Sequence, residues 1–406
     1  MRRVAYLLHN FPGLTDTFIK REIRCLEQLG AQVVVISVWT PRTGQTTPQT
    51  MSDWAGSTYF VLPKSAVSII STLIIELVRS PILFIKTFCF SLSIARSGFK
   101  GALYQLFYFV EAVLASRSIR FTQPSHIHNH IGDQSATVTM LAAMLTGIEY
   151  SITFHGWPVF FDAYQSQIRE KVKRAKFIRA ISYFCRSQLM MFAGIDDIRP
   201  FEVIHCGLQI EKYNFRMPAR DVKTIFCAAR LSPEKGLIFL LRGLATLLER
   251  GYDLRLRLAG SGPNFDELKK SVELLNLVNH VDFLGFLNED ALIDELSRAD
   301  LFVLPSFVEG LPVSVMEAMA VGVPVVATNI AGTGELVKDG VSGTLIQPAD
   351  TDDLVRAVEM VINDYDFRVR SCEVARKKVE TEFNAKSETT KLYNRFFDST
   401  LKDERC

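Results

Sequence analysis

Short apolar segments alternate with helix-like segments through residues 223–327, and this alternation constrains the fold more than any other feature. The segment 301–304 is continuously apolar, which is typical of strands in a parallel sheet that carries helices on both faces. We therefore predict an α/β fold with a doubly wound domain in this half of the chain. Its predicted strands span 223–229, 254–259, 281–286, 301–305 and 323–327, and its predicted helices span 236–249, 265–275, 290–298 and 312–321.

The first half begins with a strand, a helix and a second strand in close succession, which indicates a parallel βαβ unit. A similar strand–helix–strand pattern follows further along. Periodicity is lost near 205–222, where we place the join between two domains. The predicted strands of the first half span 3–8, 33–38, 126–128 and 150–154, and its predicted helices span 17–29 and 137–145.

The composition describes a folded chain without a strong overall charge. Of the 406 residues, 48% are hydrophobic and 22% are charged, which excludes a disordered chain. The formal net charge of +2 gives no reason to expect a nucleic acid as partner. The seven cysteines are scattered without a CxxC pair, which argues against a disulfide framework or a zinc site. The apolar run at 4–8 is too short for a secretory signal, so we expect a cytoplasmic protein.

The segment 64–120 is strongly apolar but interrupted by charges. Seven Lys and Arg against two Glu give it a local charge of +5, and its longest charge-free stretch has 11 residues. A membrane-spanning helix needs about 20 apolar residues, so we expect none here. Pro81 is expected to divide the segment into two helices. On a helical wheel the polar residues share one side, namely Ser68, Thr72, Glu76, Arg79 and Lys86.

Two interpretations of the segment 64–120 stay open. Its helices would pack in the core of the first domain, which is the usual fate of apolar helices. Alternatively, they would form an amphipathic basic surface that rests on the anionic inner face of the plasma membrane. Both interpretations can hold at once.

The strongest functional signal lies directly after the strand predicted at 301–305. Glu309, Gly310, Leu311 and Pro312 form a loop, and Glu317 follows in the next helix. Proline is favoured in the first helical turn, so the free N–H groups of this helix start should face the ligand crevice of the sheet. Such N–H groups bind phosphate, and two carboxylates at this edge can accept hydrogen bonds from sugar hydroxyls.

A second signal follows the strand predicted at 223–229, in the turn Arg230-Leu231-Ser232-Pro233-Glu234-Lys235-Gly236. Two cations beside the start of a helix suit a diphosphate. The alternative is a plain helix start with Ser232 as its N-cap. Gly262 follows the next strand and would line a nucleotide base, and residues 331–335 would close the same crevice.

Histidines mark the first half of the chain. His155 directly follows the strand predicted at 150–154, where its side chain would point towards the gap between the domains. His126, His128 and His130 alternate along a strand and so share one face. We expect no metal there, because no carboxylate or cysteine pattern accompanies them in the sequence. The dinucleotide fingerprint Gly-x-Gly-x-x-Gly is absent after the first strand.

Together these motifs resemble the retaining glycosyltransferases of family 4, which have the GT-B fold. The two glutamates eight residues apart, Glu309 and Glu317, and the basic turn at 230–236 carry the likeness. The resemblance is narrowed to colanic-acid-type exopolysaccharide glycosyltransferases by three further features, namely the segments 10–23 and 126–130 and the apolar insertion at 64–120.

The resemblance implies two Rossmann-like domains that face a central cleft. The N-terminal, acceptor-side domain would span 1–205, and the C-terminal, nucleotide-sugar-binding domain would span 206–385. A helix at 386–406 would pack back on the first domain. Its docking side would consist of the apolar residues that recur there at helical spacing, Leu392, Tyr393, Phe396, Phe397 and Leu401.

The resemblance also implies roles for individual residues. Arg230 and Lys235 would hold the diphosphate of a nucleotide sugar and stabilise it as the leaving group. Glu309 would bind the donor sugar, and Glu317 would bind the ribose. His155 would approach the sugar or the acceptor from the first domain. The predicted donor site is completed by Gly13, Gly262, Gly310 and Leu311.

The resulting prediction is a retaining hexosyltransferase. It would move a sugar from a nucleotide-diphosphate donor to a lipid-linked or oligosaccharide acceptor in bacterial exopolysaccharide or cell-surface polysaccharide synthesis, without a metal or other cofactor. The alternatives are a nucleotide-sugar epimerase of the GT-B fold, an NAD(P)-dependent Rossmann oxidoreductase, and a sugar-nucleotide binder without catalysis.

Overall fold

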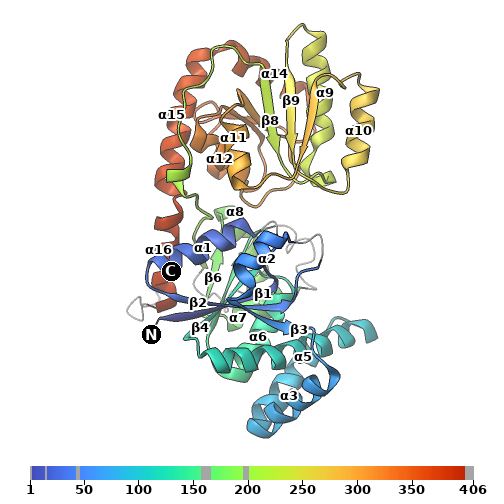
Figure 1. Ribbon diagram of the computed structural model, residues 1–406, viewed down its shortest axis with the longest axis vertical. Helices are drawn as coiled ribbons and strands as arrows, with labels where there is room; N and C mark the ends of the chain where they lie inside the picture. The colour runs from blue at the N-terminus through green and yellow to red at the C-terminus, as the bar shows by residue number, and fades with distance from the viewer. Residues whose placement is uncertain (1, 14–15, 43–45, 157–165, 195–200, 398–406) are drawn as a thin grey trace. The chain divides into compact units, whose positions relative to one another are not determined.

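The computed structural model describes residues 2–13, 16–42, 46–156, 166–194 and 201–397. These residues divide into two compact units (Figure 1). Unit 1 consists of Met1–His205 together with Lys386–Cys406, and unit 2 consists of Cys206–Ala385. Each unit contains one parallel sheet covered by helices, so the predicted α/β class is confirmed.

The described sheet of unit 1 has seven parallel strands in the order β3-β2-β1-β4-β5-β6-β7. All four predicted strands are present, whereas β3, β6 and β7 have no counterpart among the predictions. The strands are β1 (Arg3–Asn10), β2 (Gln32–Trp39), β3 (Thr58–Leu62), β4 (His126–Ile131), β5 (Tyr150–Phe154), β6 (Phe177–Ala180) and β7 (Phe201–Val203). The helices are α1 (Thr17–Gln28), α2 (Pro48–Ala55), α3 (Ala66–Arg79), α4 (Pro81–Ser93), α5 (Phe99–Thr122), α6 (Gln134–Thr146), α7 (Ile168–Arg174), α8 (Tyr183–Phe192) and α16 (Ala385–Phe397).

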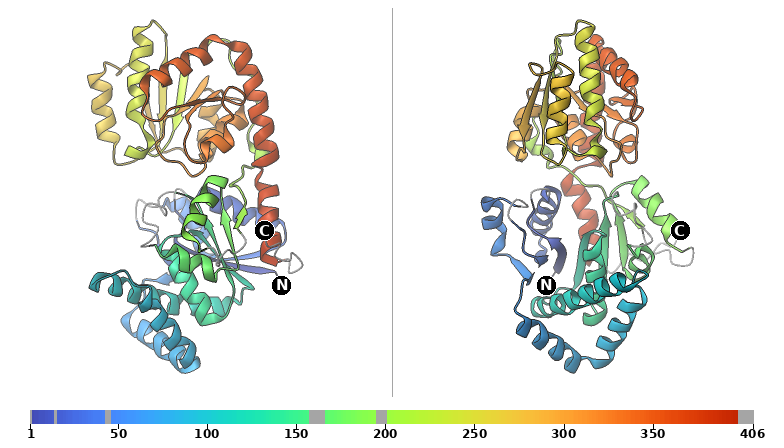
Figure 2. Two further views of the ribbon diagram at one scale, coloured as in Figure 1. Left: turned by 180° about the vertical axis from the view of Figure 1, so that it is seen from behind. Right: turned by 90° about the vertical axis from the view of Figure 1, so that its right-hand side faces the viewer.

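Helix α16 docks on unit 1 and completes its hydrophobic core. Leu392, Tyr393 and Phe396 are buried in the same cluster as Val4 and Tyr6 of β1. Both views of Figure 2 show α16, drawn in red, beside the sheet of unit 1. Phe397 packs partly buried against this cluster, and Leu401 lies outside the described residues. The two ends of the chain therefore build one core.

Helices α3, α4 and α5, which we call the helical layer, turn polar side chains inward. The buried residues of α3 are Thr72 and Glu76, and those of α4 are Thr87 and Ser91. Pro81 begins α4, as predicted. The segment nevertheless forms three helices instead of two, because the backbone breaks again before α5, where Gly98 adopts a φ of +92°.

Inward-facing polar groups of the layer find partners within unit 1. Glu76 Oε2 lies 3.3 Å from Arg120 Nη2 of α5, and Glu76 Oε1 lies 3.1 Å from Arg79 Nη1. Ser91 Oγ donates to Gln105 Oε1 of α5 at 3.2 Å. These contacts explain why the polar side packs against the protein, since a buried charge must be paired.

The apolar side of α3 and α4 faces outward instead. The most exposed apolar side chains of the layer are between 67% and 82% exposed, namely Val67, Val78, Ile82, Phe99 and Phe121. The interpretation that these helices pack in the core therefore fails for most apolar side chains of α3 and α4, and it holds for the buried C-terminal half of α5. It also holds for Phe84 and Phe88 of α4, whose rings contact Phe109 with centroids 5.0 and 5.2 Å away. No single helix among the described residues is long and apolar enough to span a bilayer; α3 and α4 qualify only as a pair, with a bend of 117° between them.

The described sheet of unit 2 has six parallel strands in the order β10-β9-β8-β11-β12-β13. The predicted elements of this half are all present, with ends shifted by one or two residues; α12 begins at Val313 because Pro312 caps it. The strands are β8 (Thr224–Ala228), β9 (Arg255–Ala259), β10 (Val281–Gly285), β11 (Leu301–Leu304), β12 (Val325–Thr328) and β13 (Thr344–Ile346). The helices are α9 (Leu237–Glu249), α10 (Phe265–Leu274), α11 (Glu289–Leu296), α12 (Val313–Val321), α13 (Thr333–Leu336), α14 (Thr351–Asn363) and α15 (Tyr365–Glu382), with 3-10 turns η3 (Ile210–Lys212) and η4 (Pro233–Lys235).

Candidate functional site

The strand order of unit 2 reverses between its two central strands. β9 and β10 lie on one side of β8, whereas β12 and β13 lie on the far side of β11. In open α/β sheets, ligands bind outside the carboxyl ends of the strands at such a reversal. The loops that leave β8 and β11 begin at Ala229 and Pro305, so both start at this edge of the sheet.

An ion pair joins these two loops. Lys235 Nζ donates to Glu309 Oε1 at 2.6 Å, and the two side chains are only 19% and 10% exposed. Ser306 Oγ donates to the same carboxylate oxygen at 2.7 Å. The pair therefore fixes a cation and a carboxylate side by side at the position where the fold favours a ligand.

Gly236 allows the two loops to approach each other this closely. Its φ is +60°, and a Cβ at this position would lie 2.2 Å from the carbonyl oxygen of Pro305. Phe307 N donates to the carbonyl of Glu234 at 2.8 Å and ties the loops together beside it. Ser232 occupies the N-cap position of the 3-10 turn η4 (Pro233–Lys235), as the alternative interpretation expected. Its side chain caps no backbone N–H, however, and donates to Glu234 Oε1 at 2.6 Å instead.

Four other predicted donor residues of unit 2, namely Arg230, Gly262, Gly310 and Leu311, lie in the loops that follow β8, β9 and β11. Arg230 is exposed at the start of the β8 loop. Gly262 follows β9, and a Cβ there would lie 2.3 Å from Leu231 O, so the β9 loop runs directly against the β8 loop. Gly310 and Leu311 connect Glu309 to α12. The loops of β9, β8 and β11 thus bring the predicted residues to one edge.

Glu317 lies apart from these loops, in α12. It is 6% exposed, and its Oε1 accepts a hydrogen bond from the hydroxyl of Tyr213 at 3.1 Å. Tyr213 is itself 1% exposed, and its carbonyl accepts from Arg376 Nη1 of α15 at 2.6 Å. Tyr213 could not be predicted from the sequence, because a single tyrosine in the aperiodic stretch near 205–222 carries no signal of its own.

Two predicted site residues, Gly13 and His155, lie in unit 1. Gly13 follows β1 and forms a turn in which its N–H donates to Asp16 Oδ2 at 2.6 Å. His155 follows β5, and its Nε2 lies 3.0 Å from His130 Nδ1. Burial, together with the nearby charge of Arg179, lowers the pKa of the His155 ring well below its usual value, so the ring is neutral near pH 7. Their part in a donor site stays a prediction.

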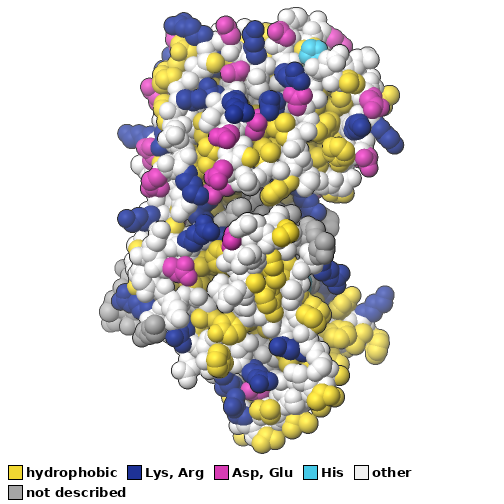
Figure 3. Space-filling model, viewed as in Figure 1, with side chains coloured by type: hydrophobic (Ala, Val, Ile, Leu, Met, Phe, Trp, Pro, Cys, Tyr) yellow, Lys and Arg dark blue, Asp and Glu magenta, His cyan; other side chains and the backbone are white. Residues whose placement is uncertain are grey.

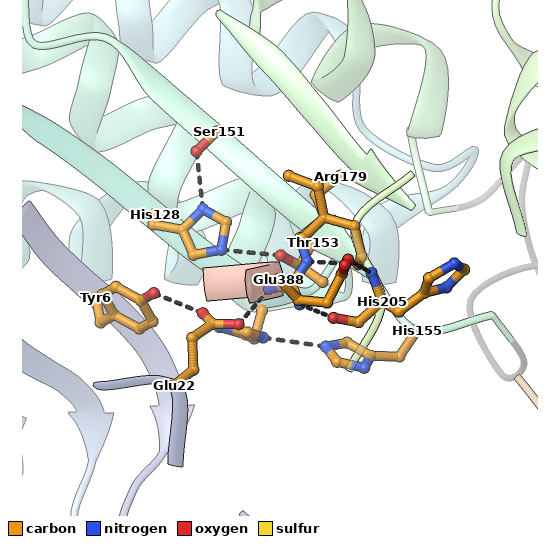
Figure 4. A network of polar contacts seen from close by, with 11 residues as sticks. Tyr6, Glu22, His128, Ser151, Thr153, His155, Arg179, His205 and Glu388 are labelled. Carbon is orange, nitrogen blue, oxygen red and sulfur yellow. Dashed lines mark hydrogen bonds and ion pairs between the residues drawn. The ribbon is translucent and has the colours of Figure 1, made fainter. Parts of the chain in front are cut away.

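Glu22 of α1 lies next to the histidines of β4 (Figure 4). Glu22, His128 and His130 each offer one ligand atom, and these atoms lie within 4.8 Å of one another. The expectation that no carboxylate accompanies the histidines is therefore wrong. This carboxylate could not be found from sequence spacing, because Glu22 and His130 are 108 residues apart.

The donor atoms of this cluster fit a hydrogen-bond network better than a metal ion. The Glu22 carboxylate forms an ion pair with Arg179, whose positive charge would repel a metal. Both ring nitrogens of His128 are engaged by hydroxyls, with Ser151 Oγ at 2.8 Å and Thr153 Oγ1 at 2.9 Å. Among the described residues this group therefore gives no reason to revise the expectation of a metal-free site.

Residues 210–378 match the family model of glycosyl transferases group 1. The matched range contains Lys235, Glu309 and Glu317 together with the strand reversal that positions their loops. The chain carries a glycosyl transferases group 1 domain. The matched range lies entirely within unit 2.

Curated relatives of this domain include proteins named for bacterial polysaccharide synthesis. A putative colanic acid biosynthesis glycosyltransferase of Salmonella typhimurium is 34% identical over 192 residues, which cover 45% of this chain and 47% of the relative. The UDP-Gal:alpha-D-GlcNAc-diphosphoundecaprenol alpha-1,3-galactosyltransferase of Escherichia coli is 26% identical over 301 residues, which cover 68% of this chain and 76% of the relative. The chain spans about half the length of most curated relatives it matches.

Solved structures share the fold over nearly the whole chain. The Anabaena protein HepE in complex with UDP and glucose superposes with a TM-score of 0.71 and 17% identity, over 97% of this chain and 98% of that chain. At this identity the likeness concerns the fold alone. The predicted GT-B fold, of which the glycosyl transferases group 1 domain forms a part, is therefore confirmed.

Proposed function

We propose that the chain is a retaining glycosyltransferase that takes a sugar from a nucleotide-diphosphate donor. The observation that carries the proposal is the Lys235–Glu309 pair at the reversal of strand order. A lysine among backbone N–H groups at the carboxyl edge of such a sheet suits a diphosphate. Negative charge develops on the leaving diphosphate during transfer, and a fixed cation lowers the barrier most at that point.

Each predicted residue has a task in this proposal. Lys235 and the exposed Arg230 bind the diphosphate, and Glu309 accepts hydrogen bonds from the sugar hydroxyls. Glu317, oriented by Tyr213, binds the ribose. The loop positions Gly13, Gly262, Gly310 and Leu311 complete the donor site, and His155 contacts the sugar or the acceptor. Because two cations already offset the diphosphate charge, the proposed reaction needs no metal.

The relatives support a particular substrate class. The HepE structure contains UDP and glucose, and the Escherichia coli relative is named for a diphosphoundecaprenol acceptor. The Salmonella typhimurium relative is named for colanic acid synthesis. By analogy, we propose transfer of a hexose to a lipid-linked or oligosaccharide acceptor in exopolysaccharide or other cell-surface polysaccharide synthesis, on the cytoplasmic side of the plasma membrane.

Donor binding and turnover test this proposal in the purified protein. Thermal-shift screening against UDP-, GDP- and dTDP-sugars selects the donor, because a ligand of the folded state raises the melting temperature. Transfer and donor hydrolysis are then compared for Glu309→Gln and Glu289→Gln. Glu289 is a matched control, since it forms a 2.6 Å ion pair with Lys212 elsewhere in unit 2.

Loss of turnover only in Glu309→Gln supports the assigned site, whereas full turnover in that variant contradicts it. The anomeric configuration of the product, read by NMR, decides whether transfer retains it. An isomerised sugar formed from the donor alone would instead identify an epimerase.

We also propose that the helical layer rests on the anionic inner face of the plasma membrane. Figure 3 shows hydrophobic side chains gathered over the end of unit 1 that this layer forms, with Lys and Arg among them. The outward apolar side chains would insert among the acyl chains, since contiguous exposed apolar patches mark interaction sites. The local charge of +5 across 64–120 would attract anionic headgroups.

Flotation with lipid vesicles tests this surface directly. Protein is expected to float with vesicles that contain phosphatidylglycerol, and less with pure phosphatidylcholine vesicles. Added salt should weaken only the electrostatic share, because screening acts on exposed charges. Absence of flotation with both vesicle types contradicts the membrane proposal without touching the donor site.

A further inference from the structure

Two N-terminal segments that carry the family likeness, 10–23 and 126–130, meet in one buried network of unit 1 (Figure 4). Glu22 of α1 is 7% exposed and His130 of β4 is 1% exposed. His130 in turn contacts His155, whose ring needs a fixed orientation in order to contact the sugar or the acceptor. The network therefore connects residues of both segments to His155, a proposed site residue.

The carboxylate of Glu22 is the anchor of this network. Tyr6 OH donates to Glu22 Oε1 at 2.6 Å, and His130 Nε2 lies 3.0 Å from the same oxygen. Arg179 Nη1 pairs with Glu22 Oε2. Burial alone would raise the pKa of the Glu22 carboxyl, but the charge of Arg179 and the hydrogen bond from His130 hold it well below its usual range. Glu22 is therefore ionised and can only accept hydrogen bonds.

Arg179 is itself fixed by the backbone. Its Nε donates to Ile204 O and its Nη2 donates to His205 O, each at 2.9 Å. His205 N donates to Glu388 Oε2 of α16 at 2.8 Å. The Arg179 guanidinium that pairs with Glu22 is therefore held in place by the backbone at 204–205, and this backbone is in turn held by α16.

The ionised Glu22 carboxylate determines which ring nitrogens of His130 and His155 carry a proton. His130 Nε2 must carry a proton in order to donate to Glu22. A neutral imidazole carries one proton, so Nδ1 of neutral His130 is an acceptor. His155 Nε2, at 3.0 Å, must then be the donor of the bond between the two rings. In this arrangement His155 is the Nε2–H tautomer and its Nδ1 is the acceptor nitrogen.

We propose that Glu22 and His130 are positioning residues for His155, which fix its tautomer and ring orientation so that Nδ1 accepts a hydrogen bond from a hydroxyl of the sugar or acceptor. The inference rests on the proposed function for the role of His155 in turnover. The tautomer itself is a property of the free protein and does not depend on that function.

Histidine-selective ¹⁵N NMR of the full chain tests the tautomer. The His155 signals are assigned by their loss in His155→Asn, and we expect the Nε2–H form alone in the unsubstituted protein. His130→Leu should convert His155 to a mixture of tautomers, whereas His130→Gln, which keeps an amide donor and acceptor, should preserve the single form. An Nδ1–H tautomer or a mixture in the unsubstituted protein overturns the proposal even if His130→Leu does not fold.

His128→Leu is the matched control for His130→Leu. His128 lies on the same strand, is 0% exposed and likewise makes two hydrogen bonds, but these go to Ser151 and Thr153. Its replacement should leave the His155 tautomer unchanged. An equal change in both variants would mean that general loosening of the sheet, and not the bond from His130, sets the tautomer, which overturns the proposal.

A kinetic cycle separates positioning from a structural role. We expect His130→Leu to lower kcat/KM roughly 10- to 100-fold, as a misplaced catalytic group does. The same substitution in a His155→Asn background should lower it less than about twofold, because residues that act through one another are not additive. Equal losses in both backgrounds overturn the positioning role. Unchanged turnover in His155→Asn would refute the proposed role of His155, while the NMR result would stand.

Discussion

The outward apolar side of α3 offers the sharpest quantitative prediction. Val67, Ile74 and Val78 are spaced at 7 and 4 residues, which places them on one stripe of the helix, and they are 77%, 55% and 76% exposed. We expect that replacing all three by Gln abolishes most of the vesicle binding proposed above. Glutamine is a good helix former, so the helix itself should persist.

The magnitude follows from the exposed fractions. Fully burying a Val or Ile side chain is worth about 1.5–3 kcal/mol, so these three partly exposed side chains together contribute about 3–6 kcal/mol when they enter lipid. Since 1.4 kcal/mol corresponds to a factor of ten, the partition coefficient should fall by at least about 100-fold. The melting temperature should change little, because the three side chains already contact water in the free protein.

Vesicle sedimentation with phosphatidylglycerol-containing vesicles, at several lipid concentrations, measures the partition coefficient. The matched control replaces Leu274, Val278 and Val374 of unit 2 by Gln; these side chains are 83%, 63% and 43% exposed. The control should keep its vesicle binding. A loss below threefold in the α3 variant, or an equal loss in the control, would refute the reasoning that this stripe enters the membrane.

Three further predictions concern the fold and the chemistry. Gly236→Ala should lower the melting temperature and the donor affinity, because a side chain in the left-handed region costs about 1–2 kcal/mol and its Cβ would lie 2.2 Å from Pro305 O. The control Gly251→Ala has a φ of +91° but open space around it, so it should show only the conformational cost and no steric clash. Burial raises the pKa of Glu111 to about 7, so the folded state holds a proton that the unfolded state has lost. As the pH rises from 4.5 to 7, the free energy of unfolding should therefore fall by up to about 3 kcal/mol relative to that of Glu111→Gln. Urea denaturation of both proteins at both pH values measures this difference. EDTA should leave the transfer rate unchanged, and a loss that Mg²⁺ or Mn²⁺ restores would contradict the metal-free proposal.

Local patterns of the sequence predict most of unit 2 and less of unit 1. Continuous apolar runs such as 301–304 can only be buried strands in this context, and they were placed within two residues. The edge strand β7 (Phe201–Val203) has three half-buried residues and no periodicity to detect. The helical wheel separates the two sides of α3 correctly, but it does not tell which side meets the protein. That choice depends on Arg120, a partner that lies in α5.

The candidate site shows the same division. Lys235 and Glu309 could be placed together from strand order, because loops after neighbouring parallel strands share one edge. Tyr213 and Glu22 could not, since each reaches its partner only through the tertiary fold, over a separation of 104 or 108 residues. Contacts of this kind leave no trace in the local pattern.

Unit 1 is assembled from both ends of the chain, and this has a consequence for biosynthesis. Leu392, Tyr393 and Phe396 of α16 fill a core whose other buried members lie between residues 4 and 204. On the ribosome, unit 2 is complete at residue 385 before unit 1 can close. The nascent N-terminal half must therefore wait with an uncovered apolar surface for the last helix. A stop codon shortly before α16 should accordingly yield a protein that is retained by chaperones or degraded, although every residue of the glycosyl transferases group 1 domain has been synthesised.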